Sequence, residues 1–229
     1  MFKSKTRSIV IPQSEHGRVA GMLAAHWGSD RFQKPPVPFE SFVKGVTLHD
    51  RGYGLLDNAP LLEMPDADWM DITRRGFDYV SADPIADIIV RHHLLRLTKY
   101  NPVESRLPEI ERMETALDEA IAASGIAPDV FQKIDRLMRL CDDIAFDFCF
   151  EQPRARKTEV YANFADDAAT PLQHTLSEGG LITLTPWPFS IPEISGFIFG
   201  YEREGYPDRL ETVIVPFRVV PFHVLAEEA

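Results

Sequence analysis

The spacing of apolar residues changes near residue 152, and this change constrains the fold of the chain more than any other feature. Before it, apolar residues recur at the short intervals of amphipathic helices, in segments separated by proline and glycine. From Arg154 onward, runs rich in β-branched and aromatic residues are typical of strands. The sequence therefore predicts a helical part over residues 1–152 and a β-rich part over residues 153–229.

Several helices and short strands are expected, each bounded by a turn or a proline. The expected helices span residues 13–27, 38–50, 67–81, 84–99, 104–123 and 128–150, and the expected strands span 8–11, 157–161, 181–184, 196–199 and 212–215. We expect the strands to form a small antiparallel sheet, which the N-terminal strand could join. With 229 residues and 45% hydrophobic content, the chain can bury one core. The predicted fold class is α+β, a single domain over residues 1–229 with a mostly α-helical core and a C-terminal antiparallel β portion.

The formal net charge of -11 argues against nucleic acid as a partner, because affinity for a phosphate backbone rests on lysine and arginine side chains that neutralise it. A small phosphorylated molecule stays compatible with this charge, since a bound metal ion can supply positive charge locally. The oligomeric state does not follow from the sequence.

The sequence contains neither a candidate membrane span nor a signal peptide. The apolar run Ile9-Val10-Ile11 ends at Pro12, and no stretch approaches the roughly 20 apolar residues that cross a bilayer. Cys141 and Cys149 stand on one expected helix, about 12 Å apart along its axis, which is too far for a disulfide. We therefore expect a cytoplasmic protein with free, buried thiols and no membrane partner.

The dipeptide His49-Asp50 follows an apolar run on the expected helix 38–50 and precedes the glycine-bearing turn Arg51-Gly52-Tyr53-Gly54. In one interpretation it only ends the helix, where a histidine favours the last carbonyl groups and an aspartate begins a turn. In the other, both side chains reach an ion near the helix end, since imidazole nitrogen and carboxylate oxygen suit zinc, manganese or iron. The dipeptide alone does not decide between them.

Asp142 lies within the apolar stripe of the expected helix 128–150, whereas Asp143 and Asp147 fall on its polar face. Burying a carboxylate costs several kcal/mol unless a salt bridge, a hydrogen-bond network or a metal compensates it. Asp143 and Asp147 are interpreted as solvated charges, with Arg139 as a surface partner of Asp143. Asp142 is therefore the candidate ligand on this helix.

Further candidates lie on two other expected helices and in one loop. His16 falls on the apolar stripe of the first helix. Of the pair His92-His93, His92 continues the stripe of helix 84–99 and is expected to face the site, with His93 behind it or at the surface. Asp57 could orient a ligand histidine, or only begin a turn.

In chain order the candidates are His16, His49-Asp50, His92 and Asp142. This order and the helical setting resemble the HD superfamily of metal-dependent phosphohydrolases, in which a histidine, a His-Asp pair and a late aspartate bind one divalent ion. The resemblance implies an HD-like helical core that holds a divalent transition metal such as manganese, iron or zinc. The ligands it implies are His16, His49, Asp50 and Asp142, with His92 as a fifth ligand or the ligand of a second ion. His174 and His223 have no assigned role.

A closer resemblance covers nearly the whole chain. The motifs around His16 and His49-Asp50, with Asp57, Asp142, Cys149 and the segment Pro186-Trp187-Pro188-Phe189, are similar to the bacterial domain-of-unknown-function family numbered 3891. That resemblance implies a fold and a set of ligands and leaves the substrate open. The aromatic segment is typical of packing at a strand edge, or could form a wall for a planar substrate.

These resemblances favour a metal-dependent hydrolase that acts on a small phosphorylated molecule through a metal-activated water. Asp50 could accept a proton from that water, and His92 could stabilise charge on the phosphate. The lysine that many HD enzymes carry beyond the His-Asp turn is absent, and Arg51, Arg91 and Arg96, the nearest positive charges, could bind an anion or lie at the surface. Two other classes stay open: an HD-like di-iron oxygenase, and a non-catalytic protein that binds a small ligand or a partner.

Overall fold

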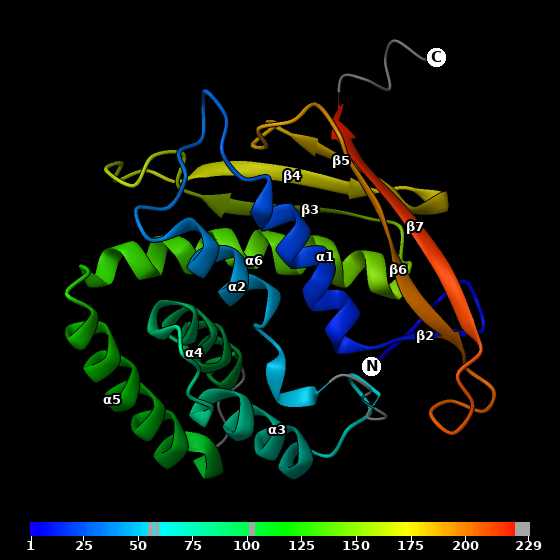
Figure 1. The fold of residues 1–229 in the computed structure, drawn as a ribbon, viewed down its shortest axis with the longest axis horizontal. Helices are drawn as coiled ribbons and strands as arrows, with labels where there is room; N and C mark the ends of the chain where they lie inside the picture. Colours follow the sequence, from blue (N-terminus) through cyan, green and yellow to red (C-terminus); the bar gives the residue numbers. More distant parts are fainter. Residues whose placement is uncertain (55–56, 58–59, 101–103, 223–229) are drawn as a thin grey trace.

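In the computed structural model, which describes residues 1–54, 57, 60–100 and 104–222, a curled sheet of seven strands covers one side of a group of six α-helices (Figure 1). The helices are α1 (Gln13–Ala25), α2 (Phe39–Thr47), α3 (Asp66–Asp78), α4 (Pro84–Lys99), α5 (Leu107–Ser124) and α6 (Pro128–Phe150). The strands are β1 (Phe2–Lys3), β2 (Ile9–Ile11), β3 (Arg154–Val160), β4 (Thr170–Leu176), β5 (Leu181–Thr185), β6 (Ile194–Glu202) and β7 (Thr212–Pro221). The short 3-10 helices are η1 (Arg51–Tyr53), η2 (Glu104–Arg106) and η3 (Glu178–Gly180).

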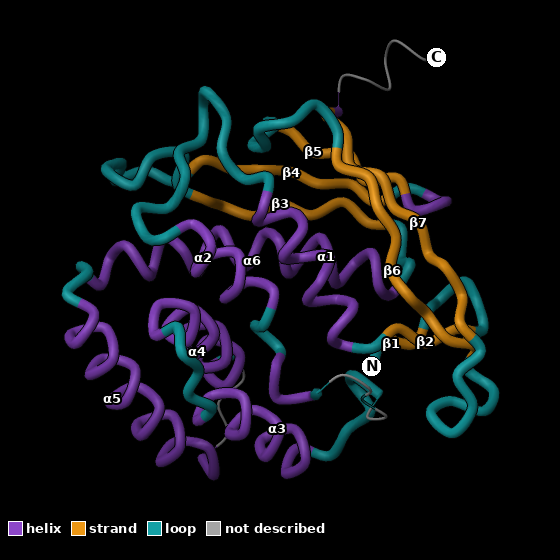
Figure 2. The backbone as a smooth tube through the Cα atoms, viewed as in Figure 1, coloured by secondary structure: helices purple, strands orange, loops and turns teal. Residues whose placement is uncertain are grey.

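The sheet joins the two ends of the described chain. Its strand order is β1-β2-β6-β7-β5-β4-β3, with β2 antiparallel to β6 and β5 parallel to β7. Figure 2 shows this sheet curling around the helices in the manner of half a barrel. The expectation of a mostly helical, HD-like core with a small C-terminal antiparallel β portion is therefore wrong. The sheet is large and mixed, and its first two strands come from the N-terminus.

Two helices lie against the concave face of the sheet. α6 contacts β3 and β4, and α1 contacts β6. The remaining helices pack on the other side of this pair, where α2 and α4 contact α1 and α6, and α3 and α5 contact α4 (Figure 1). Because α1 and α6 lie between the sheet and the other helices, each of them is covered on more than one side.

Alternation along β7 explains which face of the sheet is buried. Val215, Phe217 and Val219 are buried and alternate with exposed neighbours, which is the two-residue period of a strand with one face on a core. Phe217 packs edge-on against Phe148 of α6, with ring centroids 5.4 Å apart. Apolar contacts of this kind hold the sheet on α6.

Two glycines bring α1 and α2 close together. A β-carbon at Gly17 would stand 2.4 Å from the carbonyl oxygen of Thr47, and one at Gly21 would stand 2.0 Å from the hydroxyl oxygen of the same threonine. Since no side chain fits at such distances, only glycine permits this approach. The close packing places His16 on α1 beside His49, which follows the end of α2.

Three smaller expectations concern helices, cysteines and the aromatic segment. Within the described ranges, no helix is long and apolar enough to cross a membrane. Cys141 and Cys149 are buried and free, as expected. The ring of Trp187 packs edge-on against Phe189, and Phe189 packs on Trp27 of the loop after α1. The aromatic segment therefore serves packing at the end of α1.

Candidate metal centre

Four polar residues from three segments of the chain meet between α1, α6 and the turn that follows α2. His16 comes from α1, His49 and Asp50 from the turn between α2 and η1, and Asp142 from α6. Both histidines are buried, and the two aspartates expose 13% and 15% of their side chains. We call these residues the His/Asp cluster: His16, His49, Asp50 and Asp142.

One atom of each side chain lies close to the others. The Nε2 atom of His16 lies 2.9 Å from Nε2 of His49, 3.1 Å from Oδ1 of Asp142 and 3.7 Å from Oδ2 of Asp50. His49 Nε2 lies 3.5 Å from the same Asp50 oxygen and 3.6 Å from the same Asp142 oxygen. Two donors bound to one zinc ion at about 2.1 Å lie no more than about 4.2 Å apart. The distances from each histidine to the other histidine and to the two carboxylates are therefore compatible with a shared ion.

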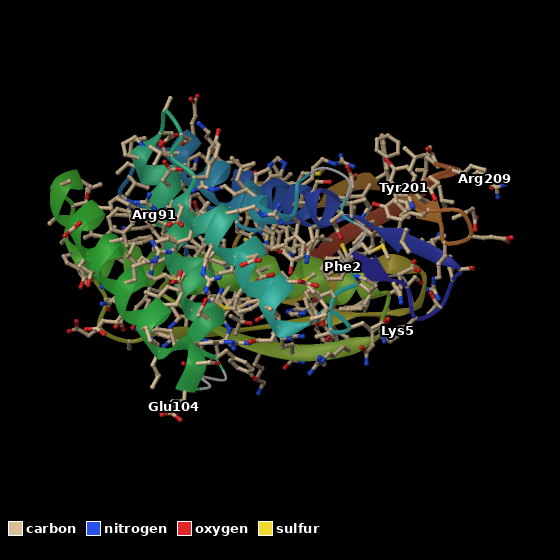
Figure 3. All side chains as sticks on the ribbon, turned by 90° about the horizontal axis from the view of Figure 1, so that it is seen from below. Phe2, Lys5, Arg91, Glu104, Tyr201 and Arg209 are labelled. Carbon is tan, nitrogen blue, oxygen red and sulfur yellow. The ribbon has the colours of Figure 1, made fainter. Side chains whose placement is uncertain are left out.

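Contacts outside the cluster orient both imidazole rings. His49 donates from Nδ1 to the carbonyl oxygen of Val46 at 2.7 Å, so its Nε2 atom points toward the carboxylates. Metal-bound imidazoles usually donate their second N–H in this way. The ring of His16 packs on Phe2 of β1, with centroids 4.9 Å apart, and Phe2 lies in the interior while Lys5 lies at the periphery (Figure 3). The N-terminal strand therefore supports the site directly.

Of the adjacent pair His92-His93, the structure places His93 at the cluster. His93 Nε2 lies 3.5 Å from Oδ1 of Asp50, and its ring centroid lies 4.7 Å from that of His49. His92 instead stacks on Phe131 of α6, with centroids 6.5 Å apart. The expected orientation of the pair is therefore reversed. Adjacent residues on a helix point about 100° apart, so only one of the two faces the cluster.

His93 is oriented as a hydrogen-bond donor rather than as a ligand. Arg96 donates to His93 Nδ1 at 2.9 Å. Because a guanidinium only donates, Nδ1 accepts, and the proton of the neutral ring lies on Nε2. Burial lowers the pKa of His93, which favours this neutral form. The Nε2 atom is buried and has no hydrogen-bond partner among the described residues, so it offers a free donor beside Asp50.

The electrostatics of the cluster favour a cation. Burial tends to lower the pKa of His49, but Asp50 and Asp142 raise it to about 9. Burial tends to raise the pKa of Asp50, but the neighbouring histidines lower it to about 2. The pKa of Asp142 also lies well below its usual range, because hydrogen bonds with His16 and His49 outweigh burial. Both carboxylates therefore stay ionised and attract a positive charge, either a proton on the histidines or a metal ion.

Three residues of the His/Asp cluster, His16, Asp50 and Asp142, line a pocket of about 520 Å³, which we call the cluster pocket. One part of its lining is basic and another is apolar. The basic residues are Arg96, Arg139, Arg154 and Arg156, and the apolar and aromatic residues include Trp69, Leu97, Tyr100 and Phe146. A pocket of this size and mixed lining suits a small molecule. Of these four arginines, only Arg96 was expected from the sequence as an anion-binding candidate. The other three come from α6 and β3, which lie far from the His-Asp turn in the chain.

A second polar group lies between α6 and the sheet. Arg156 of β3 pairs with Asp143 and donates to Asp147 at 2.7 Å, and His174 of β4 lies 2.9 Å from the other oxygen of Asp147. The expectation that these two aspartates are solvated charges is wrong, because their face of α6 packs on strands. We call this group the α6–sheet cluster: Asp143, Asp147, Arg156, Thr158 and His174. His223, the other histidine of the β-rich part, lies outside the described residues.

Asp57 and Arg51 hold the backbone around the His/Asp cluster. Asp57 accepts a hydrogen bond from the backbone N–H of Gln13 at 2.7 Å and pairs with the ammonium group of Met1, which fixes the start of α1. Arg51 exposes 8% of its side chain, pairs with Asp87 at 2.5 Å and donates to two backbone carbonyls at the end of α3. Arg51 is therefore neither a surface residue nor part of the cluster pocket, and it anchors the turn that carries His49 and Asp50.

Comparison with known proteins gives a family and little else. No curated protein and no solved structure matches the chain. The resemblance to the HD superfamily therefore has no support from these comparisons. A family model described as "Protein of unknown function (DUF3891)" matches residues 1–198, a range that includes the whole His/Asp cluster. The chain belongs to this family.

Proposed function

We propose that the His/Asp cluster binds one divalent transition-metal ion and that the chain uses it to hydrolyse a small phosphorylated molecule. One observation carries the proposal: two imidazole nitrogens lie 2.9 Å apart, and each lies 3.1–3.7 Å from one oxygen of Asp50 and one of Asp142, beside a pocket. This donor set suits manganese, iron or zinc. A divalent ion bound there would polarise a phosphoryl oxygen and lower the pKa of a water molecule.

The remaining groups of the pocket bind and orient the substrate. His93 directs its free Nε2–H into the site, where it can donate to a phosphoryl oxygen as negative charge develops. Arg96 fixes the ring of His93 by donating to its Nδ1 atom. The arginines of the lining suit phosphate, because a guanidinium presents a planar fork of donors. His93 thus takes the role in charge stabilisation that was expected of His92.

The proton of the attacking water needs an acceptor. Asp50 has one oxygen, Oδ2, near the two cluster histidines, and the other, Oδ1, turned toward His93. The second oxygen is therefore placed to accept the proton while the first binds the ion.

The geometry favours one ion over two. A di-iron centre that activates oxygen would need further ligands, and His92, which the sequence offered for a second ion, stacks on Phe131. His93 is closer, but the hydrogen bond from Arg96 leaves its Nε2 atom without a lone pair. We therefore propose hydrolysis rather than oxygen activation.

Elemental analysis of protein purified without chelator or affinity-tag metal tests the site. We expect about one equivalent of transition metal in the wild type, little or none in Asp50→Ala, and an unchanged content in the matched control His92→Ala. A wild-type protein that holds no metal after incubation with manganese, iron or zinc would contradict the site and favour a non-catalytic binding protein.

A substrate screen tests the activity separately. Phosphomonoesters, phosphodiesters and nucleotides would be incubated with the manganese-loaded protein. We expect hydrolysis of at least one class by the wild type and none by Asp50→Ala. If the wild type holds a full equivalent of metal and hydrolyses none of them, the metal site stands and the hydrolase does not.

A further inference from the structure

We infer that the ligand of the cluster pocket carries a second anionic group, which binds in a neighbouring pocket between α4 and α6. This inference rests on the proposed function for the position of the first, phosphoryl group. It adds the second group, its chemistry and its distance from the cluster.

The neighbouring pocket has a volume of about 390 Å³, and we call it the cationic pocket. Its lining carries four basic side chains and two carboxylates, an excess of positive charge in a chain with a net charge of -11. The four basic residues are Arg96, Lys133, Arg136 and Arg139, and the carboxylates are Asp129 and Asp135. A local concentration of positive charge on an acidic protein attracts small anions to that place.

Two of these arginines have guanidinium groups that other side chains leave largely available. Arg136 is exposed and has no ion-pair or hydrogen-bond partner among the described residues. Arg139 has 45% of its side chain exposed and lies 3.7 Å from Asp143, which is longer than a normal hydrogen bond. Each can therefore direct most of its donors to a ligand.

The other two basic residues are held in place and shape the pocket. Arg96 donates to Asp135 at 3.0 Å and to His93 at 2.9 Å. Lys133 donates to the carbonyl oxygen of Phe164 at 2.6 Å and lies over the ring of Tyr161. The pocket therefore has two basic side chains that are held in place and two that are largely available. Such a pocket can hold an anion without first rearranging.

The two pockets adjoin, since Arg96 and Arg139 line both. Arg136 lies six residues before Asp142 on α6, which places it about 9 Å along the helix axis from that ligand. A phosphoryl group at the cluster and an anion at Arg136 would therefore be separated by a spacer of similar length. The ligand class is a small molecule with a phosphate at one end and a phosphate or carboxylate at the other.

Calorimetric titration of the manganese-loaded protein tests the inference with three named probes. They are pentyl phosphate, the bisphosphate of pentanediol, and the phosphate ester of hydroxypentanoate, which carries a carboxylate at its far end. We expect the bisphosphate to bind at least tenfold more tightly than pentyl phosphate, and we expect Arg136→Gln and the double variant Arg136→Gln/Arg139→Gln to reduce that ratio toward one. Arg75→Gln, an exposed position on α3, is the matched control and should keep the ratio.

The carboxylate probe identifies the second group. If it matches the bisphosphate, the cationic pocket accepts any anion; if it matches pentyl phosphate, the pocket selects phosphate. The inference is overturned if neither doubly anionic probe gains affinity, or if the gain survives the double variant. Failure of the proposed function has a different signature: the bisphosphate preference persists, while no probe is hydrolysed.

Discussion

Two polar clusters share α6, and neighbouring aspartates, Asp142 and Asp143, which point about 100° apart on the helix, contribute one to each. In the α6–sheet cluster, the carboxylates are neutralised by side chains of the sheet: Arg156 pairs with both aspartates, and His174 contacts Asp147. In the His/Asp cluster, two carboxylates face imidazole rings, and the guanidinium of Arg96 lies 3.8 Å from Asp142. A buried charge needs a partner, so the first cluster is complete in itself and the second needs a cation.

The helix α6 therefore carries one cluster with a structural role and another with a functional role. Arg156 and the strands make the α6–sheet cluster a link between two layers, and only its edge, Asp143 and Arg156, reaches the cluster pocket. The His/Asp cluster holds its carboxylates against imidazole rings on the wall of that pocket. The α6–sheet cluster should therefore affect stability most, and the His/Asp cluster should affect metal content and turnover most.

The largest effect is expected for Asp142→Asn. The amide removes one of two negative ligands, so we expect metal content to fall to background and hydrolysis to fall by about 1000-fold or more, equivalent to about 4 kcal/mol in the activation barrier. Metal analysis and initial rates measure both. The control is Asp143→Asn, and a similar loss of metal in this folded control would remove the distinction between the clusters.

Asp147→Asn is expected to reduce stability by about 3 kcal/mol, because it leaves the buried His174 with a neutral partner and takes one of two carboxylates from the half-buried Arg156. Urea denaturation measures the change, and the folded variant should retain its metal. Equal stability of Asp147→Asn and the wild type would show that this cluster is solvated after all.

Metal binding should stabilise the protein by about 2.7 kcal/mol at an ion concentration 100 times the dissociation constant. For a chain of this length, that corresponds to a rise of about 5–10 °C in the melting temperature. Thermal melts with and without manganese measure it. The same rise in Asp142→Asn would indicate that the ion binds elsewhere.

The pH dependence gives the smallest effect, counted per pH unit. In the metal-free protein the pKa of His49 is raised from 6.5 to about 9, so the stability that this proton provides is fully present below pH 6.5 and is lost as the pH rises through 9. Metal must displace the proton, so metal affinity should rise over the same window by at most about tenfold, or 1.4 kcal/mol, per pH unit. Melting temperatures and metal titrations from pH 6 to 10 measure the two trends, and a metal affinity that stays constant would contradict the account.

The sequence predicts helix boundaries well, because the residues that begin or end a helix lie at its ends in the chain. The helix after Asp83-Pro84 begins where the proline and the cap require, and α6 begins at Pro128 and ends before Glu151. It does not predict the sheet, because the pairing of β2 with β6 joins residues nearly 200 apart in the chain, such as Ile9 and Glu202, and no local pattern encodes it.

Part of the candidate site could likewise be predicted from the sequence, and part of it could not. His16, His49, Asp50 and Asp142 could be proposed because their chain order resembles a known pattern, and the structure brings them together. The choice of His92 over His93 is wrong, because Ile88 and Ile89 are both buried and each histidine continues one of them, so the stripe does not distinguish the two. Asp143 and Asp147 were assigned to solvent because a polar helix face usually is solvated, whereas α6 is covered on both sides.

An anomalous-scattering crystal structure of the zinc-loaded protein tests the central claim most directly. The account predicts one ion within about 2.0–2.2 Å of His16 Nε2, His49 Nε2, Asp50 Oδ2 and Asp142 Oδ1, with His93 near but not bound. An ion bound at other side chains, or none at this cluster in a fully loaded crystal, would contradict it.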